Sequence, residues 1–453
     1  WVERGAAGIW DVTRVVAGEA LGDAGAEPGE LEAIGIRNQC ETVYVWDPAT
    51  GEPLHRAIVW QDRRTAARCA ELKEAGAEEM VRAKTGLVLD PYFSGTKIEW
   101  LLREVAGLRE RAQDGRAMFG TVDAWLLFKL TGEAVTDASN ASRTLLYDIS
   151  EGRWDPELLD LFGVPERALP RLGPSAGVLG QTRPDALHGH SVPVAGVAGD
   201  QQAALFGQAC LEPGLGKNTY GTGSFVLLNA GHTVPEAAPG LLSTVAWSVG
   251  PRPVYAREAS IFVTGAAVQW LRDGLGIIDA AAETEQLASS IDSNDGVYFV
   301  PALTGLGSPH WDPHARGTLV GLTRGTGPAQ IARAALEAIA YQTVDAIEAM
   351  QGAGTEPLAE LRADGGATSN RWLMQFQADV LGVPVVLPEV AETTALGAAF
   401  LAGVGAGLWT QSDVAASWRE KDRFEPAMIA GEREGLLTDW RRAVERSRGW
   451  ASD

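Results

Sequence analysis

Cysteine is scarce in this chain of 453 residues, which contains only 3 copies, Cys40, Cys69 and Cys210. An odd and widely spaced set of thiols does not make a disulfide framework. None of the three belongs to a Cys-x-x-Cys pair, so a structural zinc site is not expected either. This cysteine usage favours a reducing compartment, and we expect the protein to be cytoplasmic.

Long hydrophobic runs and an excess of positive charge are also missing. The most apolar stretch, residues 395–409, contains four glycines and is too short to span a bilayer, so it predicts a buried helix and no membrane insertion. Lysine and arginine number 38 against 59 aspartates and glutamates, which gives a formal net charge of -21. Such a charge repels nucleic acid, so no nucleic-acid partner is expected, and solubility accounts for it.

The length of the chain predicts two domains, because single hydrophobic cores rarely exceed roughly 250–300 residues. Strand and helix patterns alternate along it, which is typical of an α/β fold. Strands are predicted at residues 32–37, 42–46 and 57–60, and helices at 65–75, 97–105 and 328–350. We expect the first domain to cover residues 1–207 and the second to cover residues 208–453.

Asp200 follows the apolar stretch 192–197 on a glycine turn. A carboxylate in that place can accept a hydroxyl proton and help to hold magnesium, but an aspartate that bonds its own turn backbone is common too. A glycine-threonine-glycine turn follows at residues 221–223, within a hairpin predicted from 218–220 and 225–229. Its N–H groups can approach a phosphate, although an ordinary hairpin turn has the same composition. Together the two motifs indicate phosphoryl transfer.

A strand–turn–helix–strand unit is predicted from residue 358 to residue 387. The turn is Asp364-Gly365-Gly366, Ser369 or Asn370 caps the helix, and Gly382 ends it. Open α/β sheets bind ligands at such turns, so this unit could hold a nucleotide, or it could be a plain connection.

The first half of the chain supplies candidate groups for a polyol. Glu41 and Tyr92 offer a carboxylate and a phenol for hydroxyl groups, and Trp60 offers an indole wall for carbon atoms. A site for hydroxyls must pair its buried polar groups, so this mixture suits a small polyol. Core packing is the alternative for Trp60 and Tyr92.

The chain resembles the FGGY carbohydrate kinases over essentially its whole length, and within that family the glycerol kinases. The strings that carry the resemblance are Ile58-Val-Trp-Gln61, Asp90-Pro-Tyr-Phe-Ser-Gly-Thr-Lys97, Phe119-Gly-Thr-Val-Asp-Ala-Trp-Leu126, Thr136-Asp-Ala-Ser-Asn-Ala-Ser-Arg-Thr144, Gly199-Asp-Gln-Gln202, Asp364-Gly-Gly366 and residues 317–337. The resemblance implies two actin-like (ribonuclease H-like) α/β domains with a nucleotide cleft between them. It also implies ATP-dependent phosphorylation of glycerol to sn-glycerol 3-phosphate in glycerol catabolism, with Mg²⁺.

The resemblance also implies roles for individual residues. Asp200 would be the catalytic base and a magnesium neighbour. The substrate-binding set would be Cys40, Glu41, Trp60, Tyr92, Asp200, Gln201 and Phe225. The nucleotide-binding set would be Thr222, Gly265, Gln269, Gly366 and Asn370. We also expect a homo-oligomer, a dimer or tetramer. The alternatives are a related polyol or sugar kinase and a binder of nucleotide or polyol that has no catalytic activity.

Two positions depart from the family pattern. The family has an arginine beside the substrate glutamate, whereas this chain has Cys40, and a thiol is a weak donor compared with the guanidinium fork. The family also begins with a strand and a glycine-threonine phosphate loop, and nothing similar precedes Trp1. We therefore expect residues 1–453 alone to be unstable and inactive, and the natural protein to be longer at its N-terminus.

Overall fold

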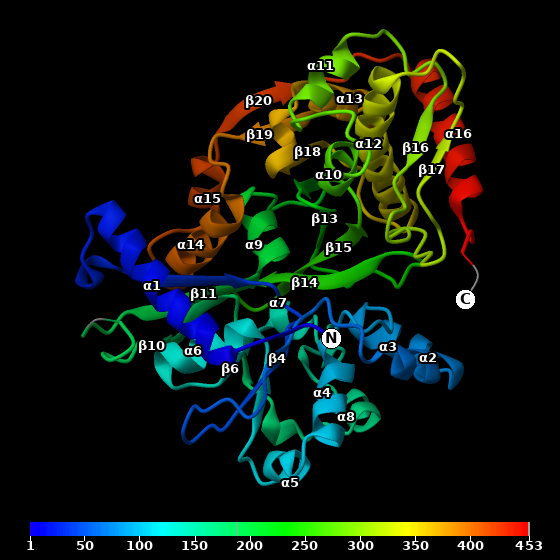
Figure 1. The fold of residues 1–453 in the computed structure, drawn as a ribbon. Coiled ribbons are helices and arrows are strands. Elements are labelled where there is room, and N and C mark those ends of the chain that lie inside the picture. The colour runs from blue at the N-terminus through cyan, green and yellow to red at the C-terminus, as the bar shows by residue number, and fades with distance from the viewer. Residues whose placement is uncertain (188, 452–453) are drawn as a thin grey trace.

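Two β-sheets organise the protein, a three-stranded sheet in the first half and a seven-stranded sheet in the second (Figure 1). The structure is a computed structural model that describes residues 1–187 and 189–451. Helices cover both sheets, which confirms the predicted α/β class.

The seven-stranded sheet joins a parallel centre to antiparallel arms. Its spatial order is β14 (Leu242–Ser248), β15 (Pro253–Ile261), β13 (Ser224–Gly231), β12 (Leu215–Tyr220), β18 (Glu360–Asp364), β19 (Val385–Pro388) and β20 (Glu420–Phe424). Strands β12 and β13 form the predicted hairpin, with Tyr220 opposite Ser224. β12, β18 and β19 run parallel, so the turns that follow β12 and β18 lie at one edge of the sheet.

The predicted strand–turn–helix–strand unit is confirmed as β18, α13 (Arg371–Leu381) and β19. The Asn370 side chain caps α13 by accepting a hydrogen bond from the backbone N–H of Leu373 at 2.9 Å. Gly382 ends the helix in the left-handed region, with φ of 72°. A capping amide and a C-terminal glycine thus set both ends of the helix, as the sequence predicts.

The three-stranded sheet has the order β10 (Ala176–Gln181), β11 (Pro193–Gly199) and β2 (Ile34–Asn38). β11 and β2 are parallel, and Gly199 at the end of one lies opposite Asn38 at the end of the other. The chain segments after both strands therefore start from the same edge of this sheet.

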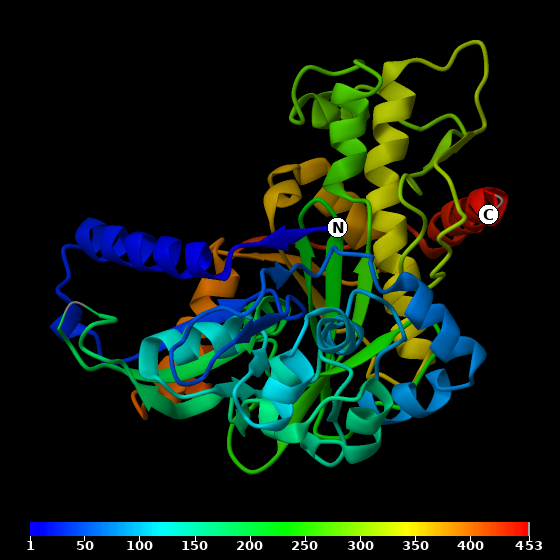
Figure 2. The same ribbon diagram turned by 60° about the horizontal axis from the view of Figure 1, so that its bottom comes forward.

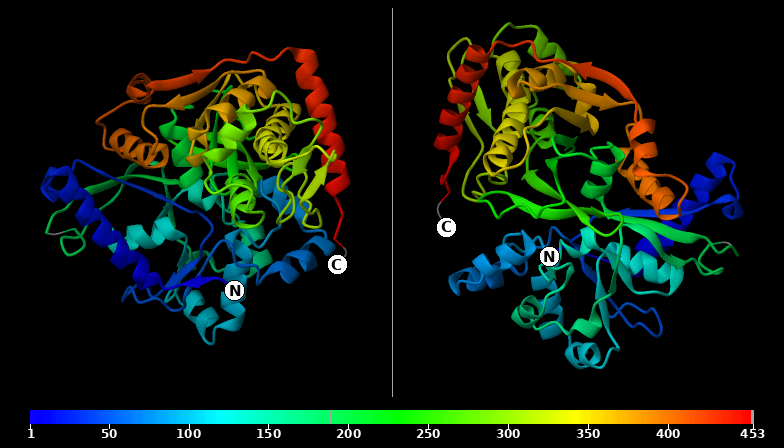
Figure 3. Two further views of the ribbon diagram at one scale, coloured as in Figure 1. Left: turned by 45° about the horizontal axis from the view of Figure 1, so that its top comes forward. Right: turned by 180° about the vertical axis from the view of Figure 1, so that it is seen from behind.

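Helices cover both faces of the seven-stranded sheet. The buried helix α12 (Pro328–Gly352) and α13 pack on one face, where Leu336 and Phe376 join one core with strand residues such as Val226. Helices α9 (Asp200–Gly207) and α14 (Thr393–Gly405) share a second core with Leu227 of the other face. The C-terminal helix α16 (Ala430–Ser447) runs along the outside, next to β16 (Tyr298–Val300) and β17 (Thr318–Val320) (Figure 3).

Helix α14 is the buried helix predicted from the apolar stretch, and it comes unusually close to its neighbours. A Cβ atom added at Gly397 would lie 1.8 Å from the Ala203 carbonyl oxygen of α9. On the strands of the smaller sheet, a Cβ at Gly35 would lie 2.1 Å from the Ala398 carbonyl oxygen. Only the absence of side chains allows backbones to approach in this way.

Helix α1 (Ala6–Ala24), for which the sequence analysis makes no prediction, extends away from the other elements (Figure 2). Only Ala6 and Trp10 of this helix are buried, whereas Val12, Val15 and Val16 are exposed. No helix among residues 1–187 and 189–451 is long and apolar enough to cross a membrane.

The other elements are short. The remaining helices are α2 (Ala66–Glu74), α3 (Glu78–Thr85), α4 (Ser94–Glu104), α5 (Leu108–Gln113), α6 (Val122–Thr131), α7 (Ala138–Ala141), α8 (Pro156–Phe162), α10 (Gly265–Asp273), α11 (Glu283–Ser289) and α15 (Gln411–Ser417). The remaining strands pair as β1 (Glu3–Arg4) with β4 (Ala57–Ile58), β3 (Tyr44–Trp46) with β5 (Met118–Gly120), β6 (Val135–Asp137) with β9 (Arg171–Gly173), and β7 (Tyr147–Asp148) with β8 (Arg153–Trp154).

Candidate active site

The parallel pair β2 and β11 brings the predicted base close to the predicted substrate glutamate. Asp200 is the first residue of α9, directly after β11, and Glu41 follows the neighbouring end of β2. Gly199 is extended rather than turned, so Asp200 begins a helix and does not sit within a tight turn. Its Oδ1 accepts the backbone N–H of Gln201 at 2.8 Å. A carboxylate at a helix N-terminus is stabilised in its charged form.

An arginine that the sequence analysis did not assign holds Glu41 in place. Arg143 donates from Nε to Glu41 Oε1 and from Nη2 to Glu258 Oε1, both at 2.9 Å. All three side chains are buried, with 2%, 5% and 1% of the Arg143, Glu41 and Glu258 side chains exposed. Burial raises the pKa of Glu41 to about 7, although Arg143 opposes this rise. The pKa of Glu41 thus lies near neutral pH because burial raises it and the charge of Arg143 lowers it.

Tyr92 and Trp60 form an aromatic corner beside these carboxylates. Their rings meet edge to face, with centroids 5.5 Å apart. Burial raises the pKa of the Tyr92 phenol well above its ordinary value, and the charge of Glu41 raises it further. Glu258 and Asp200 act on it in the same direction, so both lie within Coulombic range of the phenol. The phenol therefore stays protonated and can donate a hydrogen bond.

Strand register adds Phe225 to the same region. Phe225 lies opposite Ser260, and Glu258 is two residues before Ser260 on β15. Because side chains two apart on a strand share a face, Phe225 and Glu258 lie on one face of the large sheet. This is the face that packs toward α9, which begins with Asp200. Five predicted substrate residues, Glu41, Trp60, Tyr92, Asp200 and Phe225, thus come from elements that meet here.

A buried lysine, also unassigned from the sequence, supports the base. Lys217 Nζ donates to Thr219 Oγ1 at 3.0 Å and is hydrogen-bonded to Gln201 Oε1 as well. Burial raises the pKa of Asp200, while the positive charge of Lys217 is the largest opposing effect. Lys217 therefore keeps Asp200 closer to the ionised form that a base requires.

We expect Lys217→Met to move the acid limb of the pH profile to higher pH. Without the lysine charge, burial raises the pKa of Asp200 further, and the base must lose its proton before it can act. The measurement is kcat/KM against pH. Arg37→Met is the matched control, because Arg37 is exposed and has a smaller effect on Asp200. An acid limb that moves no further in Lys217→Met than in the control contradicts this role.

Cys40 lies beneath the joint between β11 and α9. Its thiol donates to the Asn38 carbonyl oxygen at 3.6 Å and lies 4.0 Å from Gln202 Oε1. A Cβ added at Gly199 would lie only 2.2 Å from the sulfur atom. Burial raises the pKa of the thiol well above its ordinary value, so Cys40 is a neutral side chain packed against the base-bearing joint.

We expect Cys40→Arg to improve turnover of glycerol. A guanidinium beside Glu41 adds charged hydrogen bonds to substrate, worth about 1.5–3 kcal/mol or about ten- to a hundredfold in kcat/KM. The arginine has to extend away from Gly199, since the space around the present sulfur atom is filled. Steady-state kinetics with glycerol test this. An unchanged or higher KM without a gain in kcat contradicts it.

The glycine-threonine-glycine turn sits on the first turn of α10. The Gly221 carbonyl oxygen accepts the N–H of Gly265 at 3.0 Å, and the Thr222 carbonyl oxygen accepts that of Ala266 at 3.0 Å. A Cβ at Gly265 would lie 2.6 Å from the Gly221 oxygen, so this contact requires a glycine. Gln269 is exposed one helical turn further along α10. Three of the predicted nucleotide residues, Thr222, Gly265 and Gln269, are thereby neighbours.

The Asp364-Gly-Gly366 turn lies against the same hairpin. Gly365 has φ of 93°, and a Cβ there would lie 2.3 Å from the Tyr220 carbonyl oxygen. Gly366 is exposed. The Asn370 side chain, besides capping α13, donates to Thr284 Oγ1 of α11 at 3.3 Å. The amide oxygen and one of its N–H groups are thus engaged, which leaves the second N–H and the exposed backbone of the turn for a ligand.

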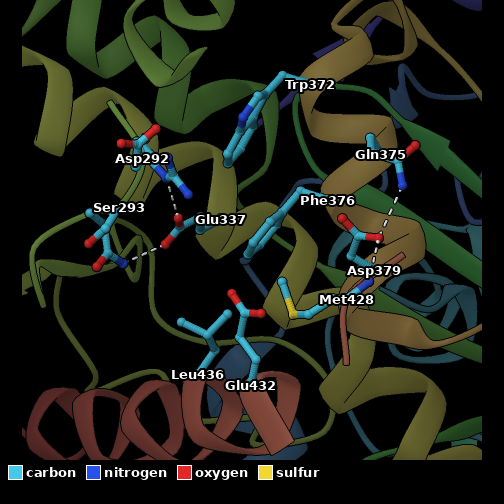
Figure 4. Close-up of a pocket in the computed structure, with 12 residues that line it drawn as sticks. Asp292, Ser293, Glu337, Trp372, Gln375, Phe376, Asp379, Met428, Glu432 and Leu436 are labelled. Carbon is cyan, nitrogen blue, oxygen red and sulfur yellow. Dashed lines mark hydrogen bonds and ion pairs between the residues drawn. The ribbon is translucent and has the colours of Figure 1, made fainter. Parts of the chain in front are cut away.

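A separate hollow of about 230 Å³ lies between α12, α13 and α16 and contains none of the predicted site residues (Figure 4). Trp372 and Phe376 stack along one wall, with ring centroids 5.1 Å apart. Glu337 points into it but is already paired with Arg333 at 2.8 Å and bonded by Asn294 at 2.5 Å. Its buried carboxylate is satisfied within the protein, so the hollow offers no free buried group for a ligand.

The residues missed by sequence reasoning are Arg143, Lys217 and Glu258. All three are buried charged side chains, which seldom occur without a partner. Arg143 stands within one of the strings quoted above, where a charged residue between small neighbours was the available signal, and Lys217 directly precedes the strand predicted at residues 218–220. Glu258 is on a strand that the sequence analysis did not predict, so no local signal placed it beside Arg143.

Comparison with known proteins gives the same family from sequence and from structure. The FGGY family of carbohydrate kinases matches through its N-terminal domain at residues 1–207 and its C-terminal domain at residues 216–406. The chain is 54% identical to glycerol kinase 2 of Thermotoga maritima and 56% identical to a glycerol kinase of Nitratidesulfovibrio vulgaris strain DP4; both alignments cover 99% of this chain and 91% of the relative.

A solved structure agrees with these relatives. The crystal structure of Plasmodium falciparum glycerol kinase with ADP matches with a TM-score of 0.92 and 34% identity, covering 99% of this chain and 90% of that one. The predicted pair of actin-like domains is thereby confirmed. The position of the boundary near residue 207 stays a prediction. The protein belongs to the FGGY family of carbohydrate kinases.

Proposed function

We propose that this protein transfers the γ-phosphoryl group of ATP to a terminal hydroxyl of glycerol, giving sn-glycerol 3-phosphate, in glycerol catabolism. The observation that supports this most is the meeting of Asp200, Glu41 and Tyr92 in one charged corner, within a chain 54–56% identical to glycerol kinases. A small polyol needs such a mixture of carboxylate and phenol for its hydroxyls.

In this proposal Asp200 accepts the proton of the attacking hydroxyl as the phosphoryl group transfers. Glu41 and Tyr92 hold the other hydroxyls, and Gln201 keeps Asp200 in position through its backbone N–H. Trp60 and Phe225 face the carbon atoms. Positioning of this kind replaces a bimolecular encounter by a reaction within one complex and supplies much of the rate.

The nucleotide and magnesium belong to the same proposal. Backbone groups of the 221–223 turn and of Gly366, with Thr222, Gly265, Gln269 and Asn370 around them, would contact ATP. No group of three or more histidine, cysteine, aspartate or glutamate side chains in the described part of the chain is arranged to hold a metal ion. Magnesium bound with phosphates needs only one or two carboxylates, and Asp200 offers one. The ion would neutralise charge on the phosphates.

A substrate panel tests the proposal. The full-length protein with ATP is expected to release ADP faster with glycerol than with erythritol, xylitol or D-xylulose. Faster release with another member of the panel would assign a related polyol or sugar kinase and make Cys40 its marker. Binding of ATP or glycerol in calorimetry without phosphorylated product would assign a binder that has no catalytic activity.

The proposal also includes a cytoplasmic location and a homo-oligomer, either a dimer or a tetramer. Sedimentation equilibrium tests the oligomeric state.

A further inference from the structure

Two complementary polar atoms are left unpaired inside the buried Arg143–Glu258 pair. Arg143 uses Nε and Nη2 for Glu41 and Glu258, but its Nη1 has no hydrogen-bond partner. Glu258 accepts through Oε1, but its Oε2 has no partner either. The first atom can only donate and the second can only accept. Buried groups of this kind are costly when unpaired, so a site with both calls for a molecule that satisfies both.

The pair borders the proposed substrate site. Glu258 shares a face of the sheet with Phe225, and its charge reaches the Tyr92 phenol. Arg143 is within Coulombic range of Cys40, where the family arginine would stand. The guanidinium of Arg143 is therefore close to position 40, where the family has an arginine and this chain has a cysteine.

We propose that Arg143 Nη1 and Glu258 Oε2 together bind one non-reacting hydroxyl of the polyol. The hydroxyl oxygen accepts from Nη1 and its proton is donated to Oε2. A hydroxyl can do both at once, whereas a carbonyl or ether oxygen accepts from Nη1 but leaves Oε2 unpaired. The pair thus selects a hydroxyl at this position, and it takes over part of the role that an arginine at position 40 has in the family. This inference rests on the proposed function.

The test compares glycerol with propane-1,2-diol and propane-1,3-diol, each of which lacks one hydroxyl, in wild type and Glu258→Gln. For glycerol we expect kcat/KM to fall about ten- to a hundredfold in the variant, the usual loss for a charged hydrogen bond. For the diol that lacks the paired hydroxyl, wild type and variant should agree within about threefold. Where a diol is not phosphorylated, its inhibition constant against glycerol is compared instead.

Arg257→Gln is the matched control, because Arg257 is buried on the same strand and lies on the opposite face, with Ser243 and the Ala353 carbonyl oxygen as partners. Arg257→Gln should lower the stability of the protein, and any change in kcat/KM should be the same for all three substrates. Equal losses of Glu258→Gln on all three substrates, or no loss on glycerol, would overturn the inference and leave a structural ion pair or a bound water. Absence of glycerol-dependent activity in the wild type would instead count against the proposed function.

Discussion

Asp200→Asn is expected to lower kcat for glycerol by about 10²- to 10⁴-fold, the usual contribution of a general base. The amide keeps the shape of the carboxylate and can still accept the N–H of Gln201, but it cannot take a proton from the substrate. Because Gln201 still bonds the side chain through its backbone N–H, and Lys217 still bonds Gln201, the replacement should fold normally. The loss should therefore be in kcat, with native thermal unfolding.

The same base predicts a pH dependence in the wild type. Burial is the largest effect on Asp200 and raises its pKa above the ordinary value, which is about 4 for aspartate. The ionised form is the active one, so kcat/KM should fall as pH drops, with its midpoint above the ordinary aspartate range.

Asp114→Asn, which removes an exposed carboxylate, is the control for Asp200→Asn and should behave as wild type. A kcat for Asp200→Asn within about tenfold of wild type would remove Asp200 from the role of base.

Gly397→Ala is expected to lower both stability and activity. The new methyl group would be placed 1.8 Å from the Ala203 carbonyl oxygen, which is backbone and cannot rotate away. Helices α14 and α9 must then separate. Overpacking of this kind costs about 1–3 kcal/mol and sometimes more. Since α9 begins with Asp200, a shift of about 1 Å there is expected to cost about a hundredfold in kcat.

Gly435→Ala is the matched control for this prediction. Gly435 is also a helical glycine, in α16, but a Cβ there meets no atom within 4 Å. Because alanine favours helices over glycine by about 1 kcal/mol, this variant should be slightly more stable and equally active. Denaturant unfolding and glycerol kinetics are measured on both variants. Equal stability of Gly397→Ala and Gly435→Ala would contradict the close contact of α14 with α9.

The elements that the sequence predicted well carry local signals. The glycines of residues 221–223 set the turn of the hairpin between β12 and β13. The capping side chain of Asn370 and the glycine at position 382 set the two ends of α13. Asp200 was identified in the same way, from an apolar strand followed by a glycine. The sequence did not show that Asp200 begins a helix instead of lying in a turn. This follows from the extended backbone of Gly199, which no residue pattern specifies.

The parts that the sequence did not predict depend on contacts between distant residues. Arg143 meets Glu258 over a separation of 115 residues, through a strand that was not predicted. Helix α1 was missed because few of its residues are buried, so it has little apolar periodicity. The packing of α14 against α9 follows from backbone approach at Gly397, and a lone glycine in an apolar run does not say what it touches.

The role of Asp200 as the base of a glycerol kinase is tested by transfer of labelled phosphate from [γ-³²P]ATP to glycerol by the full-length protein, with Asp200→Asn run beside it. We expect labelled sn-glycerol 3-phosphate in the same amount as ADP from the wild type, and almost none from the variant. Binding of ATP without any labelled product, or equal product from wild type and variant, would contradict it.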